Sequence, residues 1–134
     1  MTLVADGLGE LSALSVATPQ SIPQSEIYNI KISSIGICAG SGGSLLNGLD
    51  VDLLLTGELS HHEALAAIEQ GKCVITAFHS NTEREFLKSR MLPALNRQLA
   101  RIAPSKSTAE WGPESGFEIE VSKVDRDPFE IITI

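Results

Sequence analysis

Short apolar runs alternate with helix-like segments along the middle of the chain. Residues 32–39, 51–55 and 73–77 are apolar runs that end at small or polar residues, which is typical of buried strands. Residues 61–70 and 81–102 follow the second and third runs and carry helix signals. Strands that alternate with helices indicate βαβ units with right-handed crossovers. The pattern therefore predicts an α/β fold with a mixed, mostly parallel sheet flanked by helices.

The predicted helix 61–70 has clear signals at both ends. Ser60 is a favourable N-cap residue, and Glu63 stands three positions later, where its carboxylate can complete a capping box. Gly71 supplies the C-terminal stop. We therefore expect this helix to begin directly after Ser60.

The predicted helix 81–102 begins with the same pattern, Ser80 followed by Glu83. Pro93 lacks a backbone N–H, so we expect a kink or a break near residues 91–92. Apolar residues three or four positions apart form a single stripe that should face the core: Leu87, Met91, Leu95, Leu99 and Ile102.

The chain has an irregular beginning and a regular remainder. Residues 1–30 contain no basic residue and are rich in Ser, Gly and Pro, which predicts an irregular lead-in with one short helical or extended piece. Residues 31–134 are expected to form the α/β domain. Within it, the pattern predicts a short helix or turn over 44–49, a loop over 104–116 and a half-exposed strand over 117–124.

Composition excludes several classes of function. The 134 residues suit one compact domain, and seventeen acidic residues against ten basic residues give a net charge of −7. Nucleic-acid binding needs clustered Lys and Arg, so this chain alone is not expected to bind nucleic acid. No apolar run reaches the roughly 20 residues that span a bilayer, so no membrane association is expected. The two cysteines, Cys38 and Cys73, fit no disulfide framework and indicate a reducing compartment.

Chemically capable side chains follow all three predicted parallel strands. The carboxyl ends of such strands meet at one edge of a sheet, where α/β proteins bind ligands. All three histidines of the chain fall on this edge, together with several carboxylates. The candidate residues are Gly40, Ser41, Gly42, Gly43 and Ser44 after the first strand, Glu58, His61 and His62 after the second, and His79 and Glu83 after the third.

The glycine loop from Gly40 to Ser44 has two interpretations. Its backbone N–H groups could hold a phosphate or a carboxylate at the start of a helix. Alternatively, the glycines only turn a strand tightly into a short helix. The loop is neither a Walker A loop, because no lysine follows, nor a complete dinucleotide-binding fingerprint.

The histidines also leave alternatives open. His79 and Glu83 lie four residues apart, so an imidazole and a carboxylate could converge on a metal ion. Spacing alone favours a different role, in which Glu83 caps the helix with Ser80 and His79 is an exposed loop residue. His61 and His62 point in different directions from one helical turn, so they are poor ligands for a single ion.

Four sequence blocks together carry a family resemblance. The segments GICAGSGGSLL, DLLLTGELSHHEAL, CVITAFHSNTEREFL and VSKVDRDPF resemble the C-terminal part of the NIF-three family, also known as GTP cyclohydrolase I type 2-like. The resemblance covers about residues 31–129 and is closer to the eukaryotic branch. It implies one lobe of an α/β protein with two similar halves, which assembles into toroidal homo-hexamers and carries two divalent metal ions between its halves.

The resemblance assigns His79 and Glu83 as metal ligands. His61 and His62 would be pocket residues beside the metal ions, and with Glu58 they would shape the site or transfer protons. The metal would be Zn, Mn or Fe. The other ligands of the family lie in a His-His-Pro motif and at an Asp in its N-terminal half, and this chain has no such motif. We therefore expect a truncated family member with an incomplete metal site, from which the metal can be absent.

Two hypotheses of different classes follow from the resemblance. The first is a metal-dependent hydrolase of unknown substrate. The second is a non-enzymatic regulatory module that acts through homo-oligomerisation and protein partners. We expect the protein to be cytoplasmic, and a nuclear location in addition is compatible with both hypotheses.

Overall fold

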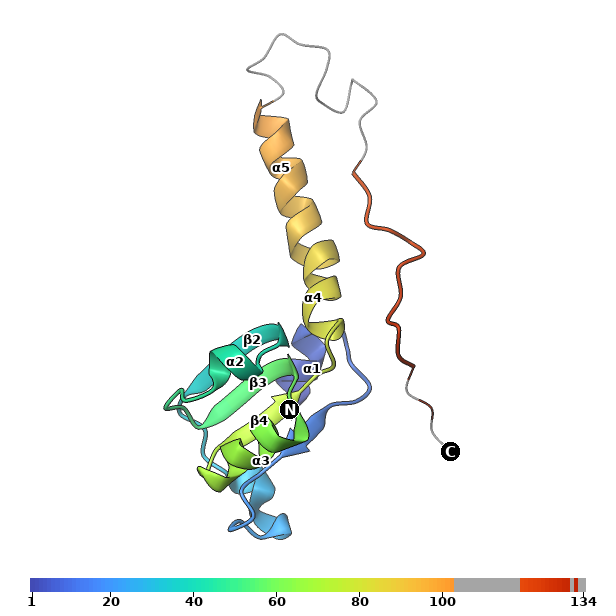
Figure 1. Ribbon diagram of the computed structural model, residues 1–134. Helices are drawn as coiled ribbons and strands as arrows, with labels where there is room; N and C mark the ends of the chain where they lie inside the picture. Colours follow the sequence, from blue (N-terminus) through green and yellow to red (C-terminus); the bar gives the residue numbers. More distant parts are fainter. Residues whose placement is uncertain (103–118, 131, 133–134) are drawn as a thin grey trace. The chain divides into compact units, whose positions relative to one another are not determined.

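The computed structural model describes residues 1–102, 119–130 and 132 (Figure 1). The chain divides into two units, residues 1–83 and residues 84–134. Within the described residues, no helix is both long and apolar enough to cross a membrane.

The first unit is built on a four-stranded mixed sheet, as the sequence predicts (Figure 1). Strands β2, β3 and β4 are parallel neighbours, and the short strand β1 pairs antiparallel with β4 to give the order β1-β4-β3-β2. Their bounds are β1 Ser15–Ala17, β2 Ile35–Ser41, β3 Leu53–Glu58 and β4 Cys73–Thr76.

Strand β2 begins three residues later than predicted. The Asp52 carboxylate accepts hydrogen bonds from the backbone N–H groups of Ser33 and Ser34, at 2.8 and 2.9 Å, and from the Ser34 hydroxyl at 3.1 Å. These bonds lower the pKa of Asp52, the Ser33 N–H having the largest effect. A side chain therefore satisfies the groups that would otherwise extend the strand.

Two apolar clusters cover the two faces of the sheet. On one face lie the helices α2 (Gly43–Leu46) and α3 (His61–Glu69). Residues of the lead-in cover the other face. Besides β1, the lead-in forms α1 (Thr2–Gly7) and the 3₁₀ helix η1 (Gln24–Asn29). Buried residues of the first cluster are Leu46, Leu54, Ala67 and Val74; those of the second are Leu53, Cys73 and Ile75, packed against Val4, Leu14, Ile30 and Ile32.

Helix α3 starts with the predicted capping box. The Glu63 N–H donates to Ser60 Oγ at 3.3 Å, and the Ser60 N–H donates to Glu63 Oε2 at 2.8 Å. The bond from the Ser60 N–H has the largest effect in lowering the pKa of the Glu63 carboxyl, and the Ser60 side chain adds to it. Gly71 follows the helix with φ +80°, in the left-handed region that glycine adopts without a steric cost.

The long predicted helix is interrupted where Pro93 predicts it. Helix α4 (Asn81–Phe86) continues into a π-helical turn, η2 (Leu87–Met91), and then into α5 (Leu92–Ile102). In a regular α-helix, the proline ring would clash with the carbonyl four residues earlier, and a wider turn before the proline relieves this clash. The interruption therefore lies beside residues 91–92, as expected.

Two sequence predictions for this region need correction. The stripe of α4, η2 and α5 does not face a core, since Leu87, Met91 and Leu95 are 37–46% exposed. The described residues 119–124 form no strand. A half-apolar segment pairs as a strand only where a free sheet edge accepts it, and the second unit contains no sheet among its described residues. The predicted loop 104–116 and residues 117 and 118 lie outside the described part.

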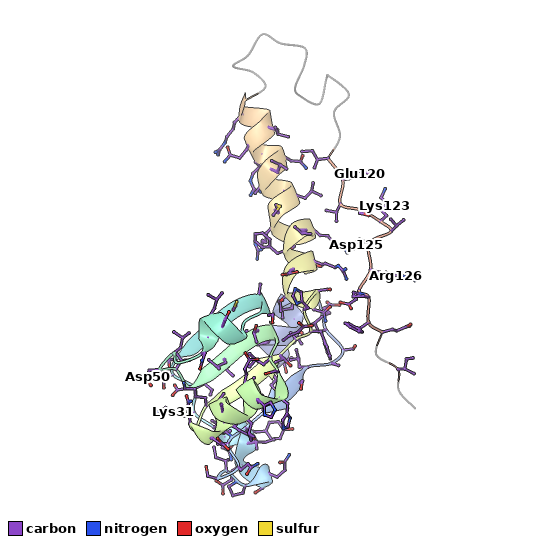
Figure 2. The ribbon with its side chains drawn as sticks, viewed as in Figure 1. Lys31, Asp50, Glu120, Lys123, Asp125 and Arg126 are labelled. Atoms are coloured by element: carbon purple, nitrogen blue, oxygen red, sulfur yellow. The ribbon has the colours of Figure 1, made fainter. Side chains whose placement is uncertain are left out.

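The segment 119–130 is held in the second unit by Arg84. The Arg84 guanidinium lies 2.8 Å from the Asp125 carboxylate and 3.6 Å from the Asp127 carboxylate, and it donates to the Arg126 carbonyl at 2.7 Å. Figure 2 shows Asp125 and Arg126 on this extended segment. The sequence blocks that contain Arg84 and Asp125 are thus in contact although they are far apart in the chain.

Candidate functional site

Three of the predicted site residues come together at the carboxyl end of the sheet. Glu58 is the last residue of β3, His79 lies three residues after β4, and Glu83 lies in the first turn of α4. The Glu58 Oε2 atom is 3.0 Å from His79 Nδ1, and the Glu83 Oε1 atom is 3.4 Å from His79 Nε2. The imidazole therefore lies between two carboxylates.

The site is open to solvent and anionic. The side chains of His79, Glu58 and Glu83 are 45%, 47% and 51% exposed. Ligands or ions could thus reach the imidazole and both carboxylates without a rearrangement of the core.

The carboxylate of Glu83 does not form the capping box that spacing alone favours. In the described chain, the only hydrogen bond between Ser80 and Glu83 joins the Glu83 N–H to the Ser80 carbonyl, at 3.2 Å. The Glu83 carboxylate instead faces the His79 ring. This orientation leaves it available as a ligand.

Gly40 forms the floor of a small space beside these two side chains. Its φ of +66° lies in the left-handed region. A Cβ at this position would lie 2.8 Å from Glu83 Oε1 and 3.1 Å from His79 Nε2. The absence of a side chain at Gly40 thus keeps open the space in which the nitrogen and the oxygen converge.

Two threonines that sequence reasoning missed hold Gly40 in place. Thr56, which is fully buried, donates its hydroxyl to the Gly40 carbonyl at 3.0 Å, and the Gly40 N–H donates to Thr82 Oγ1 at 2.8 Å. The Thr82 hydroxyl in turn donates to the His79 carbonyl at 2.7 Å. A lone polar residue at the end of an apolar strand was the one signal that could have identified Thr56.

The turn that carries His79 is tightly determined. Phe78 precedes it with φ +63°, an unfavourable conformation for a bulky residue. Asn81 Nδ2 donates to the Ala77 carbonyl at 2.9 Å. Gly57 approaches closely, since a Cβ there would lie 2.7 Å from the Gly40 carbonyl oxygen and 2.9 Å from His79 Cα. The backbone conformation of this turn thus fixes the position from which the His79 side chain extends.

The remainder of the glycine loop turns β2 into α2. Gly42 is buried, and its N–H donates to the Glu58 carbonyl at 3.4 Å. The carboxylate of Glu63 lies against Gly43. A bound anion would meet this negative charge, so the structure adds no support to the prediction of anion binding by Gly40, Ser41, Gly42, Gly43 and Ser44.

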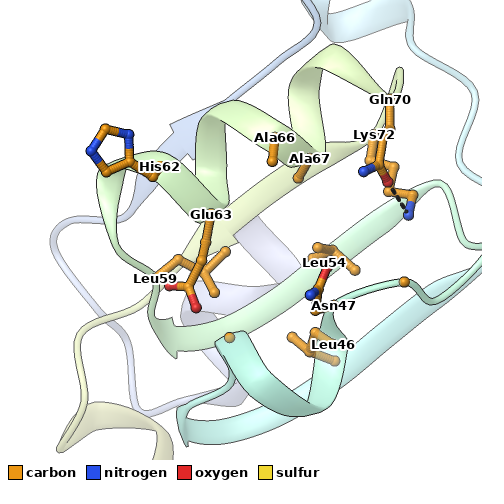
Figure 3. Close-up of a pocket in the computed structure, with 12 residues that line it drawn as sticks. Leu46, Asn47, Leu54, Leu59, His62, Glu63, Ala66, Ala67, Gln70 and Lys72 are labelled. Atoms are coloured by element: carbon orange, nitrogen blue, oxygen red, sulfur yellow. Dashed lines mark hydrogen bonds between the residues drawn. The ribbon is translucent and has the colours of Figure 1, made fainter.

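His61 and His62 lie in the first turn of α3, and their rings meet edge to face with centroids 5.8 Å apart. His62 and Glu63 line one end of a cavity of about 220 Å³ between α2 and α3 (Figure 3). Gln70 and Lys72 lie at its other end, and neither Glu58 nor His79 belongs to its lining.

The donor set suits a divalent metal ion only in part. An imidazole nitrogen is a common ligand of Zn and Fe, and a carboxylate oxygen suits Mn. However, no group of three or more His, Cys, Asp and Glu side chains within the described ranges is arranged to hold an ion. His79 and Glu83 place one nitrogen and one oxygen donor beside the Gly40 space.

Comparisons with known proteins agree with this fold. The family described as Duf34/NIF3 (NGG1p interacting factor 3) matches residues 10–113. The chain belongs to this family, as the sequence blocks indicate.

Individual relatives support the same assignment. The chain is 55% identical over 97 residues to the Protein NIF3 homolog of Schizosaccharomyces pombe, covering 72% of this chain and 31% of that protein. It is 40% identical over 119 residues to the NGG1-interacting factor 3 of Saccharomyces cerevisiae, covering 87% and 34%. The chain spans about a quarter to a third of the length of the curated relatives it matches.

Solved structures show the same fold. A Staphylococcus aureus protein has a TM-score of 0.64 at 22% identity, with 96% of this chain and 32% of that chain covered. A Bacillus cereus protein related to NIF3 also has a TM-score of 0.64, at 19% identity, with 98% and 33% covered.

Proposed function

We propose that His79 and Glu83 supply two ligands of a divalent metal site, for Zn, Mn or Fe, in a metal-dependent hydrolase. The observation that supports this proposal most is the space at Gly40, toward which His79 Nε2 and Glu83 Oε1 converge. The ion would supply Lewis-acid assistance to the hydrolysis of a phosphate ester or a cyclic amide-like bond.

The residues of this chain would hold and orient the reacting groups. Glu58 would fix the imidazole from its other side, through the contact with His79 Nδ1. His61 and His62, near the carboxyl end of β3, would contact the substrate or transfer protons. The chain supplies only two ligands, so we expect its own affinity for metal to be weak, with the remaining ligands supplied by further polypeptide.

Metal binding by the chain tests this proposal directly. Zn²⁺ competition against a chromophoric chelator should detect binding that His79→Ala and Glu83→Ala each abolish. Glu69→Gln is a matched control, because it removes an exposed carboxylate of α3. Equal binding by the wild type and both ligand variants would exclude a site at these residues.

A second candidate function is a protein-interaction module that acts through homo-oligomerisation. It is favoured by the edge strand β2, which carries no charged residue and exposes 50% of Ile35 and 70% of Ile37. These two side chains lie on one face of the strand, and uncharged edges readily accept further strands. The name of the Saccharomyces cerevisiae relative also describes an interacting factor.

Sedimentation of the chain tests this second candidate. If the β2 edge is an interface between copies, Ile37→Lys should reduce the fraction of oligomer. Leu45→Lys is the control, since Leu45 is equally exposed at 70% but lies in α2. A wild-type chain that sediments as a monomer at high concentration would argue against self-association.

A further inference from the structure

The cavity between α2 and α3 has an apolar middle. Leu46 and Leu54 line its buried part and are 3% and 5% exposed. Gly43 lies on the α2 side and Ala66 on the α3 side, and these small residues leave a space that larger side chains would fill (Figure 3). The volume of about 220 Å³ is below the roughly 300–1,000 Å³ of pockets for drug-sized ligands. The cavity therefore suits a small molecule with an apolar body.

One end of the cavity carries a negative charge. Glu63 is ionised at neutral pH, and its Oε2 atom accepts a hydrogen bond from the Ser60 N–H at 2.8 Å. Among the described residues, no hydrogen bond ends on the Oε1 atom, which lies against Gly43. An ionised carboxylate has about four sites that accept hydrogen bonds, so Glu63 can accept a further N–H group. This end therefore suits the ammonium group of a ligand.

The other end of the cavity carries a positive charge. The Lys72 ammonium donates to the Leu49 carbonyl at 2.5 Å and to Gln70 Oε1 at 2.9 Å. An ammonium group has three hydrogens, so one of them has no acceptor within the part of the chain that the structure describes. This end therefore suits a carboxylate group of a ligand.

The two charged ends are far enough apart for one ligand to span them. Glu63 and Gln70 are seven residues apart along α3, which places their Cα atoms about 10 Å apart. Hydrogen bonds of about 2.9 Å at both ends leave roughly 4–5 Å between the charged groups of the ligand. We propose that this cavity binds an ω-amino acid, whose ammonium group contacts Glu63, whose alkyl chain lies on the apolar middle and whose carboxylate contacts Lys72. The proposal does not depend on the metal site, since neither Glu58 nor His79 lines the cavity.

Titration of the ¹⁵N-labelled chain with 5-aminopentanoate tests the proposal. We expect saturable shifts of the Gly43 and Ala66 amide signals, which come from opposite sides of the cavity. Pentanoate and pentylamine each keep the alkyl chain and one charge. Each should bind about two- to fivefold more weakly, because one exposed ion pair is lost. No saturable shift with 5-aminopentanoate, or equal affinity for the three compounds, would overturn the proposal.

Charge variants assign the two ends of the ligand. Glu63→Gln should weaken pentylamine binding by about two- to fivefold without weakening pentanoate binding, and glutamine can still complete the capping box. Lys72→Met should weaken pentanoate binding and not pentylamine binding. Glu69→Gln is the matched control, because Glu69 is an exposed carboxylate of α3 outside the cavity lining. Unchanged binding in both Glu63→Gln and Lys72→Met would contradict the assigned contacts.

A third variant keeps both charges and fills the space between them. Ala66→Leu adds three carbon atoms to the α3 side of the cavity, and leucine is a good helix former, so α3 should persist. Far-UV circular dichroism checks that the variant folds. We expect it to lose binding of all three compounds. Undiminished binding by the folded Ala66→Leu chain would show that the compounds bind elsewhere and would overturn the proposal.

Discussion

Replacement of Gly40 by alanine should weaken the proposed metal site through an effect that is separable from the loss of fold stability. The added Cβ would lie 2.8 Å from Glu83 Oε1, and ordinary contact begins at 3.4 Å, so the carboxylate must move away. Metal sites tolerate deviations of only about 0.2 Å in ligand distance. The required shift is several times larger, and we expect Zn²⁺ affinity to fall at least about tenfold, or about 1.4 kcal/mol.

The effect on stability should be of similar size but separable by a matched control. Gly40 has φ +66°, a left-handed conformation that costs an alanine about 1–2 kcal/mol. Gly48 offers a matched control, because its φ is +80° and a Cβ there would have no neighbour within 4 Å. Gly48→Ala should therefore carry the same backbone cost without filling the space between His79 and Glu83.

Urea denaturation and Zn²⁺ competition, measured on both variants, test whether the space at Gly40 takes part in metal binding. We expect similar losses of unfolding free energy in Gly40→Ala and Gly48→Ala, and a loss of Zn²⁺ affinity only in Gly40→Ala. Equal Zn²⁺ affinity in the two variants would refute the reasoning, because the space at Gly40 would then play no part in metal binding.

Three further changes probe the scaffold. Thr56→Val should lower the unfolding free energy in urea by about 1–3 kcal/mol, because it removes the hydroxyl that donates to the buried Gly40 carbonyl; an unchanged midpoint would contradict this role. Ser60→Ala should cost about 1 kcal/mol by loss of the N-cap, and Ser80→Ala clearly less, since the Glu83 N–H donates to the Ser80 carbonyl; equal thermal shifts would show the two helix starts to be equivalent. Asp52 has a pKa below its ordinary value of 3.8, so its contribution to stability is complete above that value and is lost as pH falls through the folded pKa; urea midpoints of the wild type and Asp52→Asn should therefore converge in acid, and a constant difference would count against it.

Strands β2, β3 and β4 could be predicted because each contains a continuous apolar run, which β3 and β4 largely bury. Strand β1 could not, since Ser15–Ala17 is short, carries little burial and joins the sheet through its backbone bonds to β4. The failure at residues 119–124 has the opposite cause: the local pattern suited a strand, but strand formation also requires a partner. Sequence patterns report what a segment can bury, whereas pairing depends on neighbours distant in the chain.

The candidate site, like the fold, could be predicted only in part. Strand ends located Glu58, His79 and Glu83 on one edge, because parallel strands order their carboxyl ends. The roles of Thr56 and Thr82 were not predictable. They act on the backbone of Gly40 across 16 and 42 residues, and their side chains carry no motif.

The two Ser-x-x-Glu segments show why local spacing could not assign the role of Glu83. In α3, Glu63 returns to the Ser60 N–H and completes the box. In α4, the first turn is already held by the bond from Thr82 to the His79 carbonyl, and His79 offers Glu83 a partner one turn away. The same four-residue pattern thus gives a cap in one helix and leaves a carboxylate for chemistry in the other. The difference lies in the imidazole that Glu58 and the end of β4 bring to the helix start, which is a tertiary property.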